Sequence, residues 1–91
     1  MTRADILEEW NAHLAQGRRR SPHTVRAYVA TAARLLDRMG ETDWQALARF
    51  DGGALRGQLA ARRAEGIGNV SAARELSALK SFIAFARTKA G

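Results

Sequence analysis

Apolar residues in the second quarter of the chain recur at steps of three and four, and this spacing constrains the fold more than any other feature. At about 100° per residue they fall on one face of an α-helix, within an arc of about 120°. Ser21 can cap this helix, Pro22 suits its first turn, and Gly40 suits its end. The sequence therefore predicts a helix over residues 22–39 whose buried face comprises Val25, Tyr28, Val29, Ala32, Leu35, Leu36 and Met39.

Helical spacing also runs through the other parts of the chain. It predicts a helix over about 3–16, a helix from near Gly53 to Gly66 with Asp51 as its cap, and a helix beginning near Val70 or Ser71. Their expected core residues are Ile6, Leu7, Trp10, Leu14, Leu55, Leu59, Ala72, Leu76, Leu79, Phe82, Ile83 and Ala86. We place Phe85 outside this core arc, where it would meet the first helix or a partner.

The connector over residues 41–50 contains two expected core anchors, Trp44 and Leu47. A short helical turn over Asp43–Leu47, capped by Thr42, would add a fifth helix. Short connectors and amphipathic helices predict an all-α fold, a compact orthogonal bundle of four or five helices. At 91 residues and 46% hydrophobic composition, residues 1–91 are expected to form a single domain with its own core.

Composition excludes several classes of site. The chain has no cysteine, so it has neither disulfides nor thiolate metal sites, and its two histidines, His13 and His23, lack any ligand pattern around them. No apolar run approaches the roughly 20 residues of a membrane span, and acidic residues occupy the place of a signal peptide's apolar stretch. We therefore expect a cytoplasmic protein that binds no metal, cofactor or membrane.

Charge points to a polyanionic partner. The net charge is +6, and 13 of the 15 basic residues are arginine. Nucleic acid is the first candidate and an anionic membrane the second. A GC-rich coding sequence would also enrich arginine, so composition alone does not identify the partner.

Basic residues gather on two predicted helix faces and on one loop. The loop Arg18-Arg19-Arg20 runs into a helix N-terminus, whose free N–H groups and partial positive charge favour a phosphate. The small alanines on both faces would let a helix backbone approach another surface closely, while the arginines reach past them. Opposite the apolar stripe of residues 22–39 lie His23, Arg26, Ala27, Ala30, Arg34 and Arg38; on the last helix lie Ala73, Arg74, Ser77, Lys80 and Ser81.

Motifs of catalysis are missing. The chain has no nucleophile elbow, glycine-rich phosphate loop, zinc-binding helix motif or paired-carboxylate signature. Tyr28, Trp10 and Trp44 are expected in the core, and His23 is expected to face solvent or DNA. We predict that this chain is not an enzyme.

Two segments together resemble a known family. The pattern Ser21-x-x-Thr24-x-x-x-Tyr28, followed by GIGNVSAARELSALKSF over residues 66–82, is similar to the N-terminal core-binding domain of tyrosine recombinases. Xer-type enzymes, which resolve chromosome dimers, are the nearest likeness, and phage integrases come next. Tyr28 matches the buried tyrosine of this domain and not the nucleophile.

The resemblance implies a SAM-like bundle that forms half of a clamp around duplex DNA, with its second and fourth helices against the major groove. It also implies partners: double-stranded DNA, a C-terminal catalytic domain of the same parent recombinase, and other recombinase protomers on the DNA. Strand cleavage would belong to the catalytic domain, which this chain is expected to lack. The parent would act in DNA integration or in chromosome partition.

The residues expected to contact DNA come from the basic faces and from the family pattern. Thr24 and Ser71 would lie near phosphates at helix starts, and Lys80 would contact the backbone. A single duplex can touch both faces only if Arg26 and Arg74 lie on the same side of the molecule. The full set is Arg20, His23, Thr24, Arg26, Ala27, Ala30, Arg34, Ser71, Arg74, Ser77 and Lys80.

Two other functions compete with this interpretation. One is a SAM-like protein-interaction module that uses Phe85 and the first helix. The other is a helix-turn-helix regulator, which the long turn after Gly40 disfavours because no recognition helix follows it.

Overall fold

A computed structural model describes every residue except 18 and 19, and its described part contains five helices and no strand. They are α1 (Arg3–Gly17), α2 (Pro22–Met39), α3 (Trp44–Ala48), α4 (Gly52–Ala64) and α5 (Asn69–Ala90). The predicted all-α bundle is confirmed, and the short helix in the connector makes it five. None of the described helices is long and apolar enough to cross a membrane.

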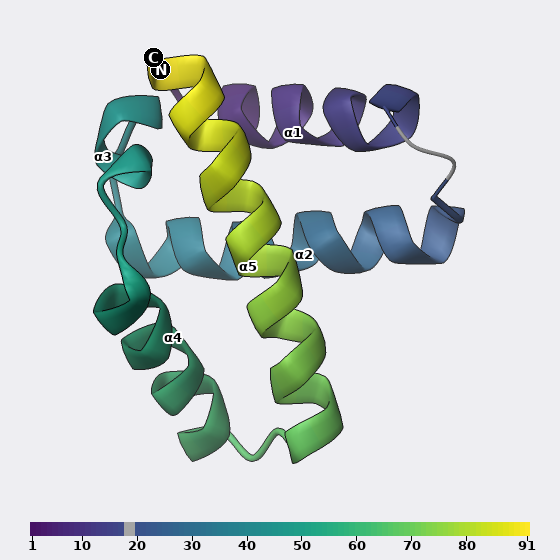
Figure 1. Cartoon of the computed structure of the whole chain (residues 1–91), viewed down its shortest axis with the longest axis vertical. Coiled ribbons are helices and arrows are strands. Elements are labelled where there is room, and N and C mark those ends of the chain that lie inside the picture. Colours follow the sequence, from purple (N-terminus) through teal and green to yellow (C-terminus); the bar gives the residue numbers. More distant parts are fainter. Residues whose placement is uncertain (18–19) are drawn as a thin grey trace.

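The arrangement places α5 across the other helices. In Figure 1, α1 and α2 lie side by side, α5 crosses in front of both, and α4 lies beside the lower half of α5. The two termini are neighbours, close to α3. The crossing of α2 by α5 matters most for function, because it brings together two faces that are far apart in the sequence.

Side-chain caps set the starts of four helices. At α1, Thr2 Oγ1 accepts a hydrogen bond from Asp5 N at 3.1 Å, and Asp5 Oδ2 accepts one from Thr2 N at 3.0 Å. Ser21 Oγ accepts a hydrogen bond from Thr24 N at 3.2 Å, and Asp51 Oδ1 accepts one from Ala54 N at 2.9 Å, as predicted. The prediction of Thr42 as the cap of α3 was wrong. This helix begins at Trp44, so Asp43 is the extended residue before it, and its Oδ1 accepts from Ala46 N at 2.8 Å.

Two helix ends differ slightly from the expected positions. Helix α4 ends at Ala64, two residues before Gly66, because the chain turns there through a positive φ of 101° at Gly66. Helix α5 begins at Asn69, and its cap position, Gly68, has no side chain to accept a hydrogen bond. The predicted stop of α2 at Gly40 is confirmed, with φ 74°.

The core lies where α1, α2 and α3 meet α5. Its largest fully buried side chains include Trp10, Phe82, Leu79 and Ile83. The predicted core residues are buried or pack against the buried cluster; Leu7, Val25, Tyr28, Val29, Met39, Leu59 and Leu76 are the partly buried ones. Phe85 does meet the first helix: its ring centroid lies 5.2 Å from that of Trp10 and 4.4 Å from that of His13.

Candidate nucleic-acid interface

An open groove lies along the crossing of α2 and α5. Its volume is about 740 Å³, too small to enclose a duplex but able to admit a ridge of phosphates or the edge of a base. Helix α2 contributes His23, Thr24, Ala27, Tyr28, Ala30, Thr31 and Arg34, and α5 contributes Ser71, Arg74, Glu75, Ser77 and Ala78.

Most of the residues predicted to contact DNA line this one groove. Sequence periodicity had placed them on two separate helices, and the fold makes the two faces converge. The predicted residues that line the groove are His23, Thr24, Ala27, Ala30, Arg34, Ser71, Arg74 and Ser77.

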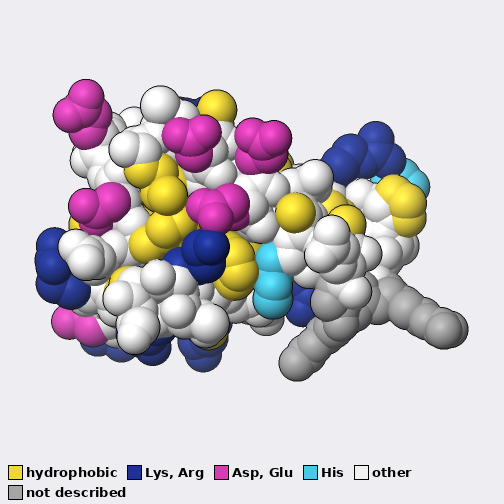
Figure 2. Space-filling model, turned by 90° about the horizontal axis from the view of Figure 1, so that it is seen from above, with side chains coloured by type: hydrophobic (Ala, Val, Ile, Leu, Met, Phe, Trp, Pro, Cys, Tyr) yellow, Lys and Arg dark blue, Asp and Glu magenta, His cyan; other side chains and the backbone are white. Residues whose placement is uncertain are grey.

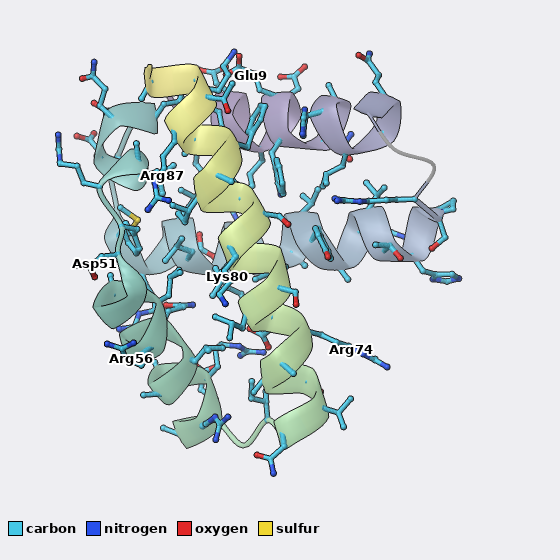
Figure 3. All side chains as sticks on the ribbon, in the orientation of Figure 1. Glu9, Asp51, Arg56, Arg74, Lys80 and Arg87 are labelled. Carbon is cyan, nitrogen blue, oxygen red and sulfur yellow. The ribbon has the colours of Figure 1, made fainter. Side chains whose placement is uncertain are left out.

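Three predicted residues lie outside the groove. Arg20 packs its guanidinium 4.8 Å from the ring centroid of Tyr28 and lines a separate hollow between α1 and α5. Arg26 is exposed beside the groove, with Nη2 3.5 Å from Nδ1 of His23, so it borders a lining residue. Lys80 is exposed about 120° around α5 from Arg74, and in Figure 3 the two side chains leave the helix in different directions. Of the arginine loop, residues 18 and 19 lie outside the described residues.

The α2 wall of the groove combines small residues with a short chain of hydrogen bonds. Ala27 and Ala30 are exposed and leave the helix surface open. Thr31 is buried, and its Oγ1 donates to the carbonyl oxygen of Ala27 at 3.0 Å and accepts from Arg34 Nη2 at 3.2 Å. The position of Arg34 is therefore defined by contacts inside the chain.

A buried carboxylate, which we did not predict, lies at the groove. Glu75 is only 7% exposed and accepts hydrogen bonds from Arg62 Nε at 3.0 Å and from Arg62 Nη2 at 3.3 Å. Its Oε1 also lies 3.6 Å from Arg34 Nη2. These contacts join α2, α4 and α5, and the hydrogen bond to Glu75 raises the pKa of Arg62 above its usual value.

The sequence does carry a signal for Glu75. It lies three residues after Ala72 and four before Leu79, so it belongs to the buried stripe of α5. A charged residue on a buried stripe needs a partner of opposite charge. Periodicity could therefore have predicted a buried ion pair here, although not which arginine completes it.

Charge is distributed unevenly around the groove. Arg74 is exposed and forms no hydrogen bond or ion pair within the described part of the chain, so its guanidinium is available to a ligand. Acidic side chains gather elsewhere: Figure 2 looks onto the end of the molecule that carries α1, and Asp and Glu cluster on it. Within the described residues, no group of three or more potential metal ligands occurs.

These features define a small helical domain with a basic groove at a helix crossing. Residues 7–90 match the sequence profile of the family described as phage integrase, N-terminal SAM-like domain. The match covers most of the chain, which therefore belongs to this family.

Two relatives of the chain share one name. The chain is 42% identical over 86 residues to a tyrosine recombinase XerC from Methylobacterium sp. (strain 4-46), covering 87% of this chain and 27% of the relative. It is 36% identical over 88 residues to a tyrosine recombinase XerC from Rhodospirillum centenum (strain ATCC 51521 / SW), covering 91% of this chain and 26% of the relative. The chain thus spans about a quarter of the length of these relatives. No solved structure matches it.

Proposed function

We propose that this chain is the core-binding domain of a site-specific tyrosine recombinase, and that the groove between α2 and α5 binds duplex DNA at the recombination core site. One observation carries the proposal. Arg74, which has no partner among the described residues, lies in a groove that Arg34 and His23 also line and whose remaining walls are largely alanine, serine and threonine. The one acid in the groove, Glu75, is buried and paired with arginines.

The chemistry of the groove suits a DNA backbone. Small side chains allow phosphates to approach the helices, and hydroxyl groups at Thr24 and Ser71 can donate to phosphate oxygens. Arg74 can also reach a base edge, where a bidentate contact to guanine is worth about 1–3 kcal/mol of discrimination. Arg20, Arg26 and Lys80, outside the groove, would contact phosphates farther along the duplex.

The proposal extends to the parent protein, because the relatives are named as tyrosine recombinases. Strand cleavage and rejoining would belong to a catalytic domain of the parent recombinase, and this chain would hold DNA without cutting it. The catalytic domain and other protomers on the DNA would be its protein partners, and its work would take place in the cytoplasm. Both chromosome-dimer resolution and integration of mobile DNA fit this role.

The test compares two arginines that differ in position. Binding of the chain to a fluorescent duplex is followed by anisotropy from low to moderate salt, for the parent chain, Arg74→Ala and Arg56→Ala. Each neutralised phosphate contributes about −0.9 to the slope of log K against log [salt], so Arg74→Ala should reduce the slope by about that amount. Arg56 is exposed on α4, on the other side of α5 from Arg74 in Figure 3, and its replacement should leave the slope unchanged.

Circular dichroism checks that each variant is folded. An equal loss for both variants would show attraction by net charge alone, and no binding by the parent chain would overturn the proposal outright.

The competing function, a protein-interaction module built on Phe85 and α1, has less support. Phe85 stacks against His13, lies tilted against Trp10, and meets Trp44 edge to face with ring centroids 5.2 Å apart. Its ring is therefore largely covered within the chain. The large hydrophobic residues that are exposed, Met1 and Val70, lie at the starts of two different helices, α1 and α5.

A further inference from the structure

The two arginines of the groove, Arg34 and Arg74, differ in their contacts, because only Arg34 is bonded to other side chains of the described structure. Its Nη2 donates to Thr31 Oγ1 at 3.2 Å and lies 3.6 Å from Glu75 Oε1. Arg74, one residue before Glu75, has no such contact within the described residues. The two arginines therefore face the groove in different states, one held and one available.

The donors of Arg34 show what the contacts leave free. A guanidinium has five N–H donors, and it recognises guanine or a phosphate in a bidentate manner through two adjacent nitrogens. Nη2 is engaged by Thr31 and Glu75, and Nε is buried without a partner. Nη1 is the nitrogen without a contact in the described residues, so a bidentate contact of Arg34 with DNA through Nη1 and Nη2 would compete with Thr31 and Glu75 for Nη2.

Glu75 is itself fixed in place. Its side chain is 9% exposed, and Arg62 of α4 binds both of its oxygens, at 3.0 Å and 3.3 Å. Arg62 also pairs with Glu65 at the end of its own helix. The carboxylate therefore cannot turn away from Arg34 without breaking a buried ion pair.

We propose that Glu75 is a positioning residue that restrains Arg34 and limits its grip on DNA. This inference rests on the proposed function, because it concerns the same groove. While restrained, Arg34 contributes one directed N–H contact, and its charge is offset by the carboxylate behind it. Released, it would act as a free arginine that neutralises a phosphate of any sequence, so Glu75 keeps non-specific binding low.

The decisive variant is Glu75→Gln. The amide keeps an oxygen that can accept from Arg62 while removing the charge that holds Arg34. We expect the chain to bind random-sequence duplex more tightly, with the salt slope steeper by about 0.9, the value for one additional phosphate. The matched control is Glu65→Gln, which makes the same change of net charge. Glu65 also pairs with Arg62 but lies outside the groove, so this variant should leave the salt slope unchanged.

A double-mutant cycle assigns the effect to Arg34. In an Arg34→Ala background, Glu75→Gln should no longer steepen the slope, because no restrained arginine remains. A slope that rises equally in both backgrounds, or equally for Glu65→Gln, would overturn the inference and indicate a general charge effect. An unchanged slope for Glu75→Gln would overturn it as well.

Two further measurements cover the other outcomes. If circular dichroism shows that Glu75→Gln is unfolded, Thr31→Val is the alternative variant. Valine has the same shape as threonine but cannot accept the hydrogen bond from Arg34, so the salt slope should again become steeper. Proton exchange of Arg34 Nε–H, followed by NMR without DNA, should be slow in the parent chain and faster in Glu75→Gln but not in Glu65→Gln. Equal exchange in all three would refute the restraint itself, whereas absence of DNA binding by the parent chain would refute the proposed function and the effect on DNA together.

Discussion

A single carboxylate on α1 joins three helices. Glu9 Oε2 accepts a hydrogen bond from Trp44 Nε1 of α3 at 3.0 Å, and its Oε1 lies 2.7 Å from Lys89 Nζ of α5. The hydrogen bond to Lys89, followed by that to Trp44, lowers the pKa of Glu9. The folded state therefore favours the ionised form of this side chain.

This contact predicts part of the acid response of the fold. Because the pKa is lower in the folded state, the unfolded chain takes up the proton first as the pH falls. The contribution of Glu9 to the free energy of unfolding should be complete above the ordinary glutamate pKa of about 4.3 and should disappear as the pH falls through the lower, folded value. Thermal unfolding of the parent chain and of Glu9→Gln, followed by circular dichroism from pH 7 to pH 3, measures this.

Glu9→Gln should be less stable than the parent chain at pH 7, and the difference should narrow in acid. Glu8→Gln is the control, because Glu8 is an exposed neighbour without a bonding partner in the described structure. A constant difference between Glu9→Gln and the parent chain across the whole pH range would contradict the prediction.

Individual residues show where sequence reasoning ends. Periodicity assigns each residue to a face, so it placed Trp10 and Phe82 correctly in the core, and it would have placed Glu75 there had its position on the buried stripe been considered. It does not state which residue of a distant helix lies opposite. The bonds of Glu9 to α3 and α5 and the choice of Arg62 for Glu75 depend on that packing, and they became visible only in the structure.

At the scale of one helix, α4 contains a glycine that its conformation does not require. Gly57 lies in the helix interior, is exposed, and an added Cβ would meet nothing within 4 Å. Glycine costs a helix interior about 0.5–1 kcal/mol relative to alanine. Gly57→Ala should therefore raise the free energy of unfolding by about that amount, as measured by urea denaturation.

The matched substitution at the end of α2 should act in the opposite direction. Gly40 also has open space around an added Cβ, but its φ is +74° and its ψ is −140°. Such a backbone conformation costs a residue with a side chain about 1–3 kcal/mol. Gly40→Ala should lower the free energy of unfolding by about that amount, and a gain in stability would show that the helix end can rearrange.

Helix starts were predictable wherever the capping side chain stood next to a clear apolar pattern, as at Ser21 and Asp51. The start of α3 was misassigned by one residue because Thr42 and Asp43 are both good caps. In a five-residue helix the apolar pattern is too short to choose between them. The start of α5 has no side-chain cap at all, so its position follows from the turn before it.

At the scale of the molecule, the candidate site depends on an angle between helices. The sequence predicts a basic face on each of two helices but not that the faces meet, and it was the family resemblance that assigned both to one duplex. Arg74 lines the groove from α5, and Arg26 of α2 stands beside it, next to the lining residue His23. The resemblance also placed Lys80 at the DNA. Lys80 lies on the same helix as Arg74 but outside the groove.

The position of a charge, more than the net charge of +6, should therefore decide binding. Two substitutions make the same change of one unit at different places: Ser77→Lys adds a cation in the groove, and Glu8→Gln removes an acid from α1, which contributes no residue to the groove. Ser77→Lys should steepen the salt slope of duplex binding by about 0.9, because the new ammonium can neutralise one phosphate. Glu8→Gln should raise affinity slightly at low salt, where screening is weak, and leave the slope nearly unchanged.

The two variants separate a directed interface from a diffuse positive charge. Both surfaces are solvent-exposed, so neither substitution should alter the helical content seen by circular dichroism. If the slopes of the two variants were equal, DNA would approach the protein without a preferred orientation. A steeper slope for Ser77→Lys alone means that the duplex lies against the crossing of α2 and α5, where small residues let it come close.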